Sequence, residues 1–237
     1  MIIIKSEAFI TDKGKNETNE DTFKYKSGNY YLVCDGVGGN GNGEIVSLLL
    51  ASSIASSLSK LNNSNVLNAL QEAEKRIENH KKKYPKTKSM SSTLALTQII
   101  GNTILIAWVG DSRAYQFRKG KIIYKTSDHS IVSEAIKKGL LTEVEALFHP
   151  ERNGLTRSVK GSSQPTTIEQ QLLTDVEEND YFLICSDGII ESWIDSDLEE
   201  LFSKSMPSNY IIEKLDKNCS VFSNDNYTAI VYQVGFV

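Results

Sequence analysis

Carboxylates stand at four places in this chain where a strand is expected to end. They are Glu20 with Asp21, then Asp35, Asp187 and Asp225. Asp35 and Asp187 precede a glycine and Asp225 precedes an asparagine, so these side chains are placed to leave the core and point into a cleft. Carboxylates that converge there repel one another unless a cation lies between them. The pattern therefore predicts a metal-centred active site.

The predicted ligands are all oxygen donors. Such a set suits Mg²⁺ or Mn²⁺ and disfavours a zinc site, which would use thiolates or imidazoles. Gly36 can add its backbone carbonyl, because a glycine lets the backbone approach a bound group closely. Without metal, like-charge repulsion should strain the site, so cation binding is expected to stabilise the fold.

Short apolar runs bounded by turn formers predict the strands that position these acids. Gly101-Asn102 and the turn at 118–121 each join two such runs as a hairpin, which indicates antiparallel sheet. Strands are expected at 30–34, 94–100, 103–109, 113–117, 122–124, 181–185 and 227–232, and helices at 44–61, 65–84, 131–138, 142–148 and 208–217. Long helices beside antiparallel hairpins favour helices packed outside a sheet sandwich.

The composition is typical of one sizeable intracellular domain. The chain has 237 residues, 40% of them hydrophobic, and a formal net charge of -4. Its basic run at 80–83 is interpreted as a solvated helix end, so no nucleic-acid partner is expected. Its apolar runs are shorter than the roughly 18 residues that a membrane span needs. Cys34, Cys185 and Cys219 lack ligand spacing and are expected to be buried free thiols in a reducing compartment.

Two short motifs suggest other chemistries. Residues 36–41 match GxGxxG, but Asp35 would put a negative charge beside a pyrophosphate and the next segment is helical, which disfavours dinucleotide binding. Asp128, His129 and Ser130 include the residue types of a hydrolase relay, but adjacent residues do not easily form one and no GxSxG elbow is present. We interpret Asp128 and Ser130 as caps of the following helix.

The order of the motifs is more specific than any one of them. In sequence they are Asn19-Glu20-Asp21, Asp35-Gly36-Val37-Gly38-Gly39, Ser89-Met90-Ser91-Ser92-Thr93, Gly110-Asp111-Ser112-Arg113, Ser127-Asp128-His129-Ser130, Cys185-Ser186-Asp187-Gly188 and Asp225-Asn226. This order resembles that of the metal-dependent protein Ser/Thr phosphatases, the type 2C family, and most closely its compact bacterial members. The resemblance spans about Ser6 to Val234.

The resemblance implies the fold. It implies a single phosphatase domain over 1–237, built as a four-layer αββα sandwich in which two mainly antiparallel β-sheets are flanked by helices. The segment at about 130–164 interrupts the strand pattern with glycine and proline. It is expected to form a flap near the active site, and the alternative is a surface excursion without a role in the site.

The resemblance also implies roles at a binuclear Mg²⁺ or Mn²⁺ centre. Asp35 is similar to the carboxylate that bridges both ions, and Gly36 to the backbone-carbonyl ligand. Asp187 and Asp225 are similar to the ligands of the other ion. Through the metal-activated water, Asp35 and Asp187 would be the catalytic residues.

Four further residues complete the implied centre. Glu20 and Asp21 are similar to the acidic pair that holds the first metal and its waters. Asp111 matches the acid that many members use, with the equivalent of Asp187, for a third and weaker ion. Asn226 is expected to orient the last ligand.

The chain departs from the family's usual pattern at two positions. The family usually has an arginine three residues before the Asn-Glu-Asp motif to grip the substrate phosphate, and this chain has Asn16 there. Lys15 is the nearest cation, although it offers a point charge rather than a bidentate fork, and Arg152 and Arg157 of the flap are the other candidates. Several eukaryotic members have a general-acid histidine where this chain has Val37.

The implied function is hydrolysis of phosphoserine and phosphothreonine in phosphoproteins by a metal-activated water. A Ser/Thr kinase that the enzyme opposes is the implied partner, and a cytoplasmic monomer with no nucleic-acid or membrane partner is expected. The alternative is a pseudophosphatase that binds a phosphoprotein without turnover. The missing arginine favours this alternative, whereas the complete carboxylate set argues against it. Metal-dependent turnover would distinguish the two.

Overall fold

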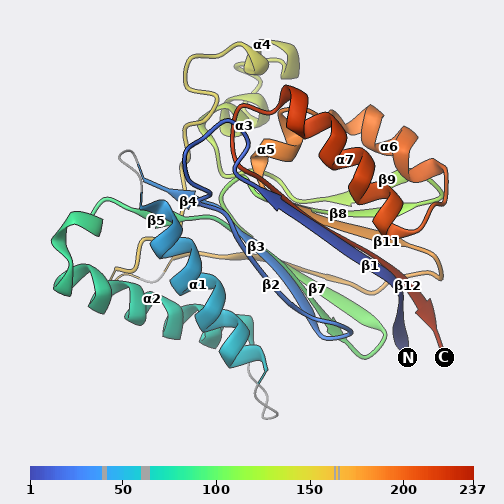
Figure 1. The fold of residues 1–237 in the computed structure, drawn as a ribbon, viewed down its shortest axis with the longest axis horizontal. Helices are drawn as coiled ribbons and strands as arrows, with labels where there is room; N and C mark the ends of the chain where they lie inside the picture. The colour runs from blue at the N-terminus through green and yellow to red at the C-terminus, as the bar shows by residue number, and fades with distance from the viewer. Residues whose placement is uncertain (39–41, 60–64, 163, 165) are drawn as a thin grey trace.

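Two five-stranded β-sheets face each other in the computed structural model, and helices cover the outer face of each (Figure 1). The structure describes residues 1–38, 42–59, 65–162, 164 and 166–237. One sheet contains, in spatial order, β1 (Ile2–Asp12), β12 (Tyr227–Phe236), β11 (Tyr181–Cys185), β8 (Arg113–Arg118) and β9 (Lys121–Lys125). The other contains β10 (Glu169–Leu173), β7 (Thr103–Val109), β6 (Leu94–Ile100), β3 (Tyr30–Cys34) and β2 (Thr22–Lys26). Neighbouring strands pair antiparallel, which confirms the predicted αββα sandwich.

The helices form the two outer layers and a projecting segment. The second sheet is covered by α1 (Gly43–Leu58) and α2 (Val66–Lys83), and the first by α5 (Asp187–Ile190), α6 (Asp195–Ser203) and α7 (Ser208–Phe222). The flap contains α3 (Ile131–Lys137) and α4 (Glu143–Leu147), which stand out from the sandwich (Figure 1). The short strands β4 (Gly36–Val37) and β5 (Ser91–Ser92) pair with each other, and the one-turn helix η1 (Pro85–Thr87) precedes β5.

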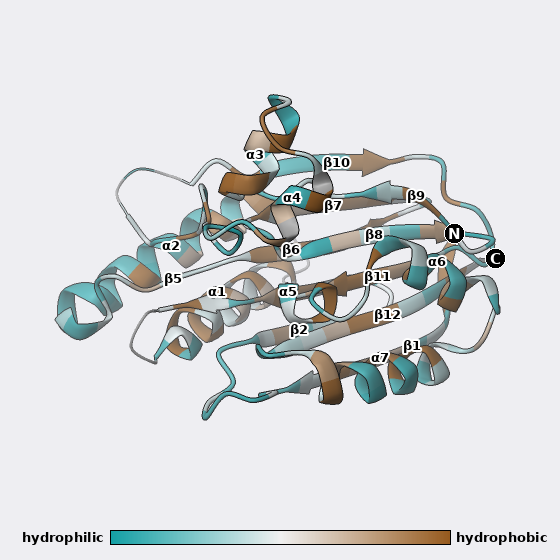
Figure 2. Cartoon of the chain, turned by 90° about the horizontal axis from the view of Figure 1, so that it is seen from above, coloured by the Kyte–Doolittle hydropathy of each residue, from teal (hydrophilic) through white to brown (hydrophobic). Residues whose placement is uncertain are grey.

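The central strands are apolar throughout because both faces of each sheet are buried. In β3, Tyr31 and Val33 belong to the core between the two sheets, whereas Leu32 and Cys34 belong to the core under α1 and α2. A run with no polar alternation is the pattern of a strand buried on both faces. Figure 2 shows this distribution, with apolar residues along the strands and many polar residues on the helices.

Most predicted elements are present, with some differences in length. The strands predicted at 30–34, 94–100, 103–109 and 181–185 have the observed bounds. The helix predicted at 44–61 is α1, and its predicted last residue lies outside the described part of the chain. The helix predicted at 208–217 continues to Phe222, and the strand predicted at 227–232 continues to Phe236. The sequence did not predict the short elements β4, β5 and η1, nor β1, β2, β10, α5 and α6. β1, β2 and β10 have mixed polar faces because they lie at sheet edges.

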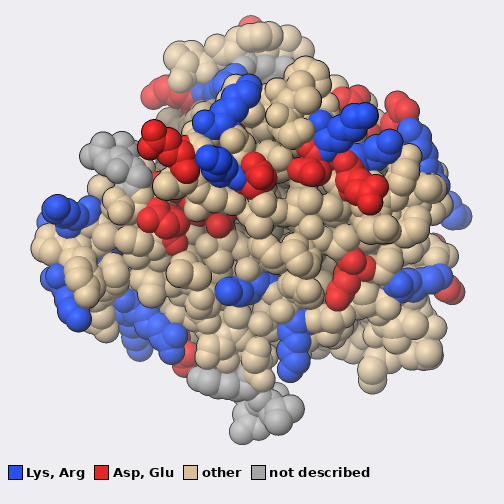
Figure 3. Space-filling model, in the orientation of Figure 1, with Lys and Arg blue, Asp and Glu red and all other residues tan. Residues whose placement is uncertain are grey.

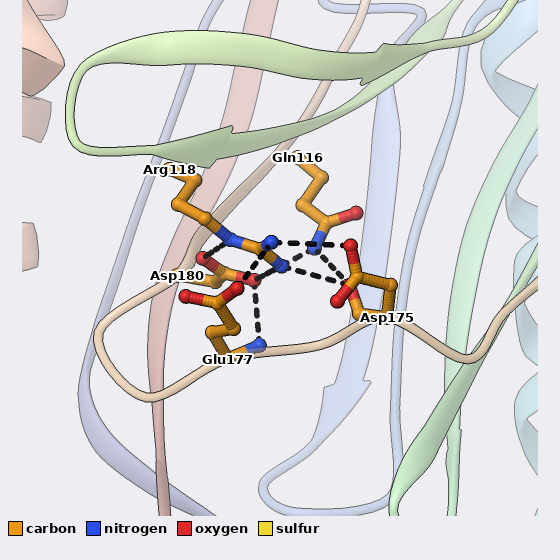
Figure 4. A network of polar contacts seen from close by, with 5 residues as sticks. All are labelled: Gln116, Arg118, Asp175, Glu177 and Asp180. Atoms are coloured by element: carbon orange, nitrogen blue, oxygen red, sulfur yellow. Dashed lines mark hydrogen bonds and ion pairs between the residues drawn. The ribbon is translucent and has the colours of Figure 1, made fainter.

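A network of charged side chains fixes the end of the first sheet at which β11 begins (Figure 4). At its centre is Asp180, whose side chain is fully buried. Arg118 donates from Nε to one carboxylate oxygen of Asp180 and from Nη2 to the other, both at 2.9 Å. Gln116 and the backbone N–H of Glu177 donate to Asp180 Oδ2 at 2.7 and 2.9 Å. Asp175 also pairs with Arg118, but its side chain is 82% exposed.

Asp180→Ala is expected to lower the free energy of unfolding by about 3–5 kcal/mol, because it leaves the largely buried Arg118 guanidinium without its buried partner. Asp175→Ala is the matched control and should cost less than about 1 kcal/mol, since Asp175 is an exposed partner of the same arginine. Urea denaturation of both variants measures the difference. Equal losses would contradict the central role of Asp180.

The three cysteines are buried free thiols, as predicted. Burial raises the pKa of each one, which keeps the thiols protonated and unreactive near neutral pH. Among the helices that the structure describes, none has the length and apolar character of a membrane span.

Candidate metal centre

Three of the predicted metal ligands meet beyond the ends of three strands. Asp35 follows β3, Asp111 follows β7 and Asp187 follows β11. One carboxylate oxygen from each residue lies within 4.8 Å of the others. Because β3 and β7 each pair antiparallel with β6, they run in the same direction and end at the same edge of their sheet. The sandwich thus brings together acids that are far apart in the sequence, and all three side chains are half-buried.

Asp21 lies next to this cluster and is 8% exposed. Ser186 Oγ donates to Asp21 Oδ2 at 2.7 Å, while Ser186 Oγ itself accepts the backbone N–H of Thr228 at 2.9 Å. Ser186 therefore fixes the Asp21 carboxylate between the end of β11 and the start of β12. Sequence analysis missed this role, although Ser186 stands directly before a predicted ligand.

Two buried carboxylate oxygens at the centre have no hydrogen-bond donor among the described residues. They are Asp21 Oδ1 and Asp187 Oδ1, and Glu44 Oε2 nearby is in the same situation. A buried charged oxygen without a donor is costly. A hard divalent cation would satisfy these atoms, and the all-oxygen donor set fits Mg²⁺ or Mn²⁺.

Close backbone packing brings Gly36 into contact with Glu20. Gly36 N donates to the carbonyl oxygen of Glu20 at 3.1 Å. A Cβ on Gly36 would lie 2.4 Å from the carbonyl of Gly43, and a Cβ on Gly43 would lie 2.2 Å from Glu20 Oε2. Only glycines fit at these two positions. Of the glycine-rich loop that follows, residues 39–41 lie outside the described part of the chain.

Asp225 lies just before β12 and is not one of the three carboxylates grouped within 4.8 Å. Its carboxylate is oriented by two donors. Asn16 Nδ2 and the backbone N–H of Asn226 each donate to Asp225 Oδ1 at 2.8 Å. The position where the family usually has an arginine therefore supports a predicted metal ligand here. An asparagine is suited to this contact because it donates a hydrogen bond and carries no charge.

Asn226 fixes the loop that carries the first acids. Its Oδ1 accepts the backbone N–H of Glu20 at 2.8 Å, and its Nδ2 donates to the carbonyls of Lys13 and Thr18 at 2.8 and 2.9 Å. Asn226 was expected to orient Asp225. It contacts that carboxylate through its backbone, and its side chain holds residues 13–20 against β12.

The electrostatics of the cluster are those of crowded, buried acids. Burial, followed by the charges of Asp225 and Glu20, raises the pKa of Asp21 from 3.8 to about 6. Burial, followed by the charge of Asp128, raises the pKa of Asp111 from 3.8 to about 6. The pKa values of three further carboxyls are raised first by burial and then by neighbouring acids; these are Glu20, Asp35 and Asp187. The folded chain therefore binds protons, or cations, in this region more readily than the unfolded chain does.

A pair of hydroxyls holds the loop of Asp111 against that of Asp35. Thr93 Oγ1 accepts the backbone N–H of Asp35 at 2.9 Å and lies 2.6 Å from Ser112 Oγ. Gly110 has φ +98°, and a Cβ there would lie 2.6 Å from the Thr93 methyl carbon. These contacts hold Thr93 against the Gly110-Asp111-Ser112 turn.

His129 supports the same turn from outside. Its Nδ1 accepts the backbone N–H of Gly110 at 3.0 Å, and its Nε2 lies 3.0 Å from Glu169 Oε1. These contacts assign a proton to Nε2. His129 is thus structural.

The predicted cap residues of α3 have different roles. Ser130 is the N-cap, because its Oγ accepts the backbone N–H of Ser133 at 3.2 Å. The expectation for Asp128 is wrong: its two oxygens accept from Arg113 Nε and Nη2 at 2.8 and 2.7 Å. Bidentate pairing with a largely buried guanidinium is stronger than an exposed cap contact.

The three candidate phosphate-binding cations lie in different surroundings. Lys15 Nζ donates to Asn224 Oδ1 at 2.9 Å, next to Asp225. Arg152 Nη2 lies 3.9 Å from Glu191, whose other oxygen accepts the backbone N–H of Asn224. Arg157, in contrast, pairs with Glu169 at 3.1 Å. Lys15 and Arg152 thus flank the turn before Asp225, whereas Arg157 is engaged beside His129.

Comparison with known proteins agrees with this geometry. The family model described as Protein phosphatase 2C matches residues 5–135. The serine/threonine phosphatase stp of Listeria monocytogenes serotype 4b (strain F2365) is 28% identical over 249 residues, which cover 95% of this chain and 94% of that protein. A crystal structure of a bacterial serine phosphatase superposes with a TM-score of 0.89 at 25% identity and covers 99% of both chains. The serine/threonine phosphatase Stp1 of Staphylococcus aureus has a TM-score of 0.88 at 25% identity, over 99% of this chain and 96% of that one.

Proposed function

The chain belongs to the protein phosphatase 2C family, and we propose that it hydrolyses phosphoserine and phosphothreonine in proteins with the help of two Mg²⁺ or Mn²⁺ ions. The observation that carries this proposal is the cluster of Asp35, Asp111 and Asp187 within 4.8 Å, together with the donorless oxygens of Asp21 and Asp187. A site of this charge would repel a phosphate group unless cations neutralise it. The proposed site therefore requires metal.

We propose a role in the centre for each predicted ligand. Asp35 is proposed to bridge the two ions, with the Gly36 carbonyl, Asp187 and Asp225 as further ligands. Glu20 and Asp21 would hold one ion and its waters, and Asp111, with Asp187, a third and weaker ion. When bound, the ions supply positive charge for the phosphoryl oxygens and lower the pKa of the water nucleophile.

The surrounding residues keep these ligands in place before substrate arrives. Ser186 fixes Asp21, Asn16 fixes Asp225, and Thr93 fixes the backbone of Asp35. Ligands that are already oriented lose little conformational entropy on binding a cation. This preorganisation is what a metal site on a rigid scaffold provides.

Lys15 is the proposed phosphate contact, because its ammonium lies beside the turn before Asp225. Lys15→Ala is expected to raise KM for a phosphothreonine peptide about five- to tenfold with little change in kcat, as expected when binding is lost equally in the ground and transition states. Arg157→Ala should leave KM unchanged, since that guanidinium is paired with Glu169. Steady-state kinetics of both variants tests the assignment, and the opposite ranking would transfer the role to Arg157.

The test of the function is phosphate release from a phosphothreonine peptide by the wild-type chain in EDTA, Mg²⁺ or Mn²⁺. Turnover that appears only with added metal supports the proposal. Measurable metal binding without turnover would support the alternative, a pseudophosphatase that binds a phosphoprotein. The cluster of Asp35, Asp111 and Asp187 and the oriented carboxylate of Asp21 do not favour that alternative. A Ser/Thr kinase whose phosphoproteins this enzyme dephosphorylates is the proposed partner, and a cytoplasmic monomer is the proposed state.

A further inference from the structure

A groove of about 690 Å³ lies between the end of α2 and the segment that returns from the flap. Its lining includes Lys82, Lys88, Ser89, Met90, Lys160 and Ser162. Lys88, Ser89, Lys160 and Ser162 are exposed, and Met90 forms a buried part of the wall. The groove is therefore open to solvent, with lysines and hydroxyls around an apolar floor, and Glu78 is also part of its lining.

Lys81 joins the walls of this groove. Its ammonium donates to the carbonyls of Lys88 and Lys160 at 3.2 and 2.7 Å, and also to that of Met90. The interpretation of residues 80–83 as a solvated helix end is thus wrong for Lys81. Gly161 packs tightly on the same helix, because a Cβ there would lie 2.3 Å from Ile77 Cγ2. The two walls are consequently held at a fixed separation.

The groove carries an excess of positive charge. Lys82 pairs with Glu78 at 2.9 Å, whereas in the described part of the chain no acid pairs with Lys88 or Lys160. Burial, followed by the positive charge of Lys160, lowers the pKa of Lys81. Lys81, Lys82, Lys88 and Lys160 against the single acid Glu78 leave an excess of positive charge in the lining. Such an excess favours an anion. In Figure 3, basic side chains lie at the edge where α2 ends, and acidic side chains lie beside them around β4.

The groove is connected directly to the proposed metal centre. Met90 leads into β5, and Lys160 follows Val159, which exchanges backbone hydrogen bonds with Ser92 at 2.8 and 3.0 Å. Ser92 in turn pairs with Gly36. Since paired strands lie about 4.8 Å apart, the near end of the groove is roughly 10 Å from Gly36.

From this arrangement we infer that the groove binds acidic side chains of the phosphoprotein substrate, a few residues away from the phosphorylated one. The inference rests on the proposed function, because the phosphoresidue must occupy the metal centre. An extended peptide rises about 3.3 Å per residue, so the groove is reached about three to five residues from the phosphothreonine. Lys88 and Lys160 are the residues that select the substrate.

The test uses three phosphothreonine peptides. Two carry three Asp or Glu residues at these distances, one on the amino-terminal and one on the carboxyl-terminal side of the phosphothreonine. The third has Gln at the same positions. For the wild type, kcat/KM should be about tenfold higher for one of the acidic peptides, through a lower KM, and 0.5 M NaCl should remove the preference. Lys88→Gln with Lys160→Gln should reduce the preference to about one. Lys88→Glu with Lys160→Glu should reverse it toward a peptide that has Lys at the same positions.

A second pair of lysines provides the matched control. Lys204 and Lys214 line a different groove, beside α6 and α7, and Lys204→Gln with Lys214→Gln should keep the wild-type preference. Hydrolysis of p-nitrophenyl phosphate, which is too small to reach the groove, should be equal in all these proteins. Equal kcat/KM for acidic and Gln peptides in the wild type would overturn the inference.

A binding measurement separates this inference from the proposed function. The same peptides are made with a non-hydrolysable phosphonate in place of the phosphate. Fluorescence anisotropy then measures their binding affinity without turnover. A binding preference for acidic peptides that is lost in the Lys88/Lys160 variant supports the groove even if no peptide is hydrolysed. Turnover without any such preference would leave the phosphatase assignment intact and refute the groove.

Discussion

Asp35→Asn is expected to lower Mn²⁺-dependent phosphate release by about 10³-fold or more. Asp35 is the carboxylate on which the charges of Asp21, Asp187, Asp111 and Asp225 all act, so it lies where the proposed ions must be shared. Replacing it with an amide of the same shape removes one negative charge from the ligands of both ions. Metal ions contribute several kcal/mol to such reactions, and about 4 kcal/mol corresponds to this loss of rate.

The stability of the variant distinguishes loss of activity at the metal centre from loss of activity through unfolding. In EDTA near neutral pH, Asp35→Asn should be more stable than the wild type, because the buried carboxyl no longer has to be ionised among other acids. Asp197→Asn, at an exposed position in α6, should change neither activity nor metal-linked stability. Wild-type turnover by Asp35→Asn would refute the bridging role.

The metal-free protein is expected to lose stability as the pH rises from about 4 to above 6. The pKa values of Asp21 and Asp111 are raised from 3.8 to about 6 by folding. Well below pH 3.8 both groups are protonated in both states, and above pH 6 the folded state holds ionised groups that it disfavours. Stability therefore falls with rising pH, by about 3 kcal/mol for each carboxyl across this whole pH range. His129 acts with the opposite sign, because burial lowers its pKa below 6.5, but several acids outweigh one histidine.

Thermal unfolding at pH 5.0 and 7.5 measures this effect. In EDTA, Tm should be about 5–10 °C higher at pH 5.0, given that 1 kcal/mol shifts Tm by about 2–4 °C at this chain length. Excess Mn²⁺ should raise Tm strongly at pH 7.5 and weakly at pH 5.0, where protons compete for the carboxylates. A Tm in EDTA that is constant or rises with pH would contradict the like-charge origin of these shifts.

The sequence allowed the central strands and the acids to be predicted, because both are local signals. The run from Tyr30 to Cys34 is apolar, β-rich and followed by Asp35-Gly36, so strand and predicted ligand are visible together. The edge strand β1 has no such signal: its pattern is partly polar, and it is a strand because β12 pairs along its whole length. Long-range pairing of this kind cannot be read from one segment.

The same distinction applies to the candidate site. The types of the acids indicated a metal centre, but the residues that orient them depend on contacts across the chain. Asn16 was noted for the arginine that it replaces, and its contact with Asp225 joins residues 209 apart. Ser186 and Asp21 are 165 apart. Lys81 looked like part of a charged helix end, and only the return of the flap segment brings the carbonyl of Lys160 to its ammonium.

The position of β12 has a consequence for how the enzyme becomes active during synthesis. β12 is late in the sequence, yet it lies between β1 and β11 and directly follows Asp225 and Asn226. A chain still on the ribosome can form the second sheet with α1 and α2, but β1 must wait for its neighbour, and the loop of Glu20 must wait for Asn226. Bringing together segments that are so far apart in the sequence is slow compared with local folding. Metal binding is therefore expected only after β12 has been made, since a fragment that ends before Asp225 lacks one of the predicted ligands.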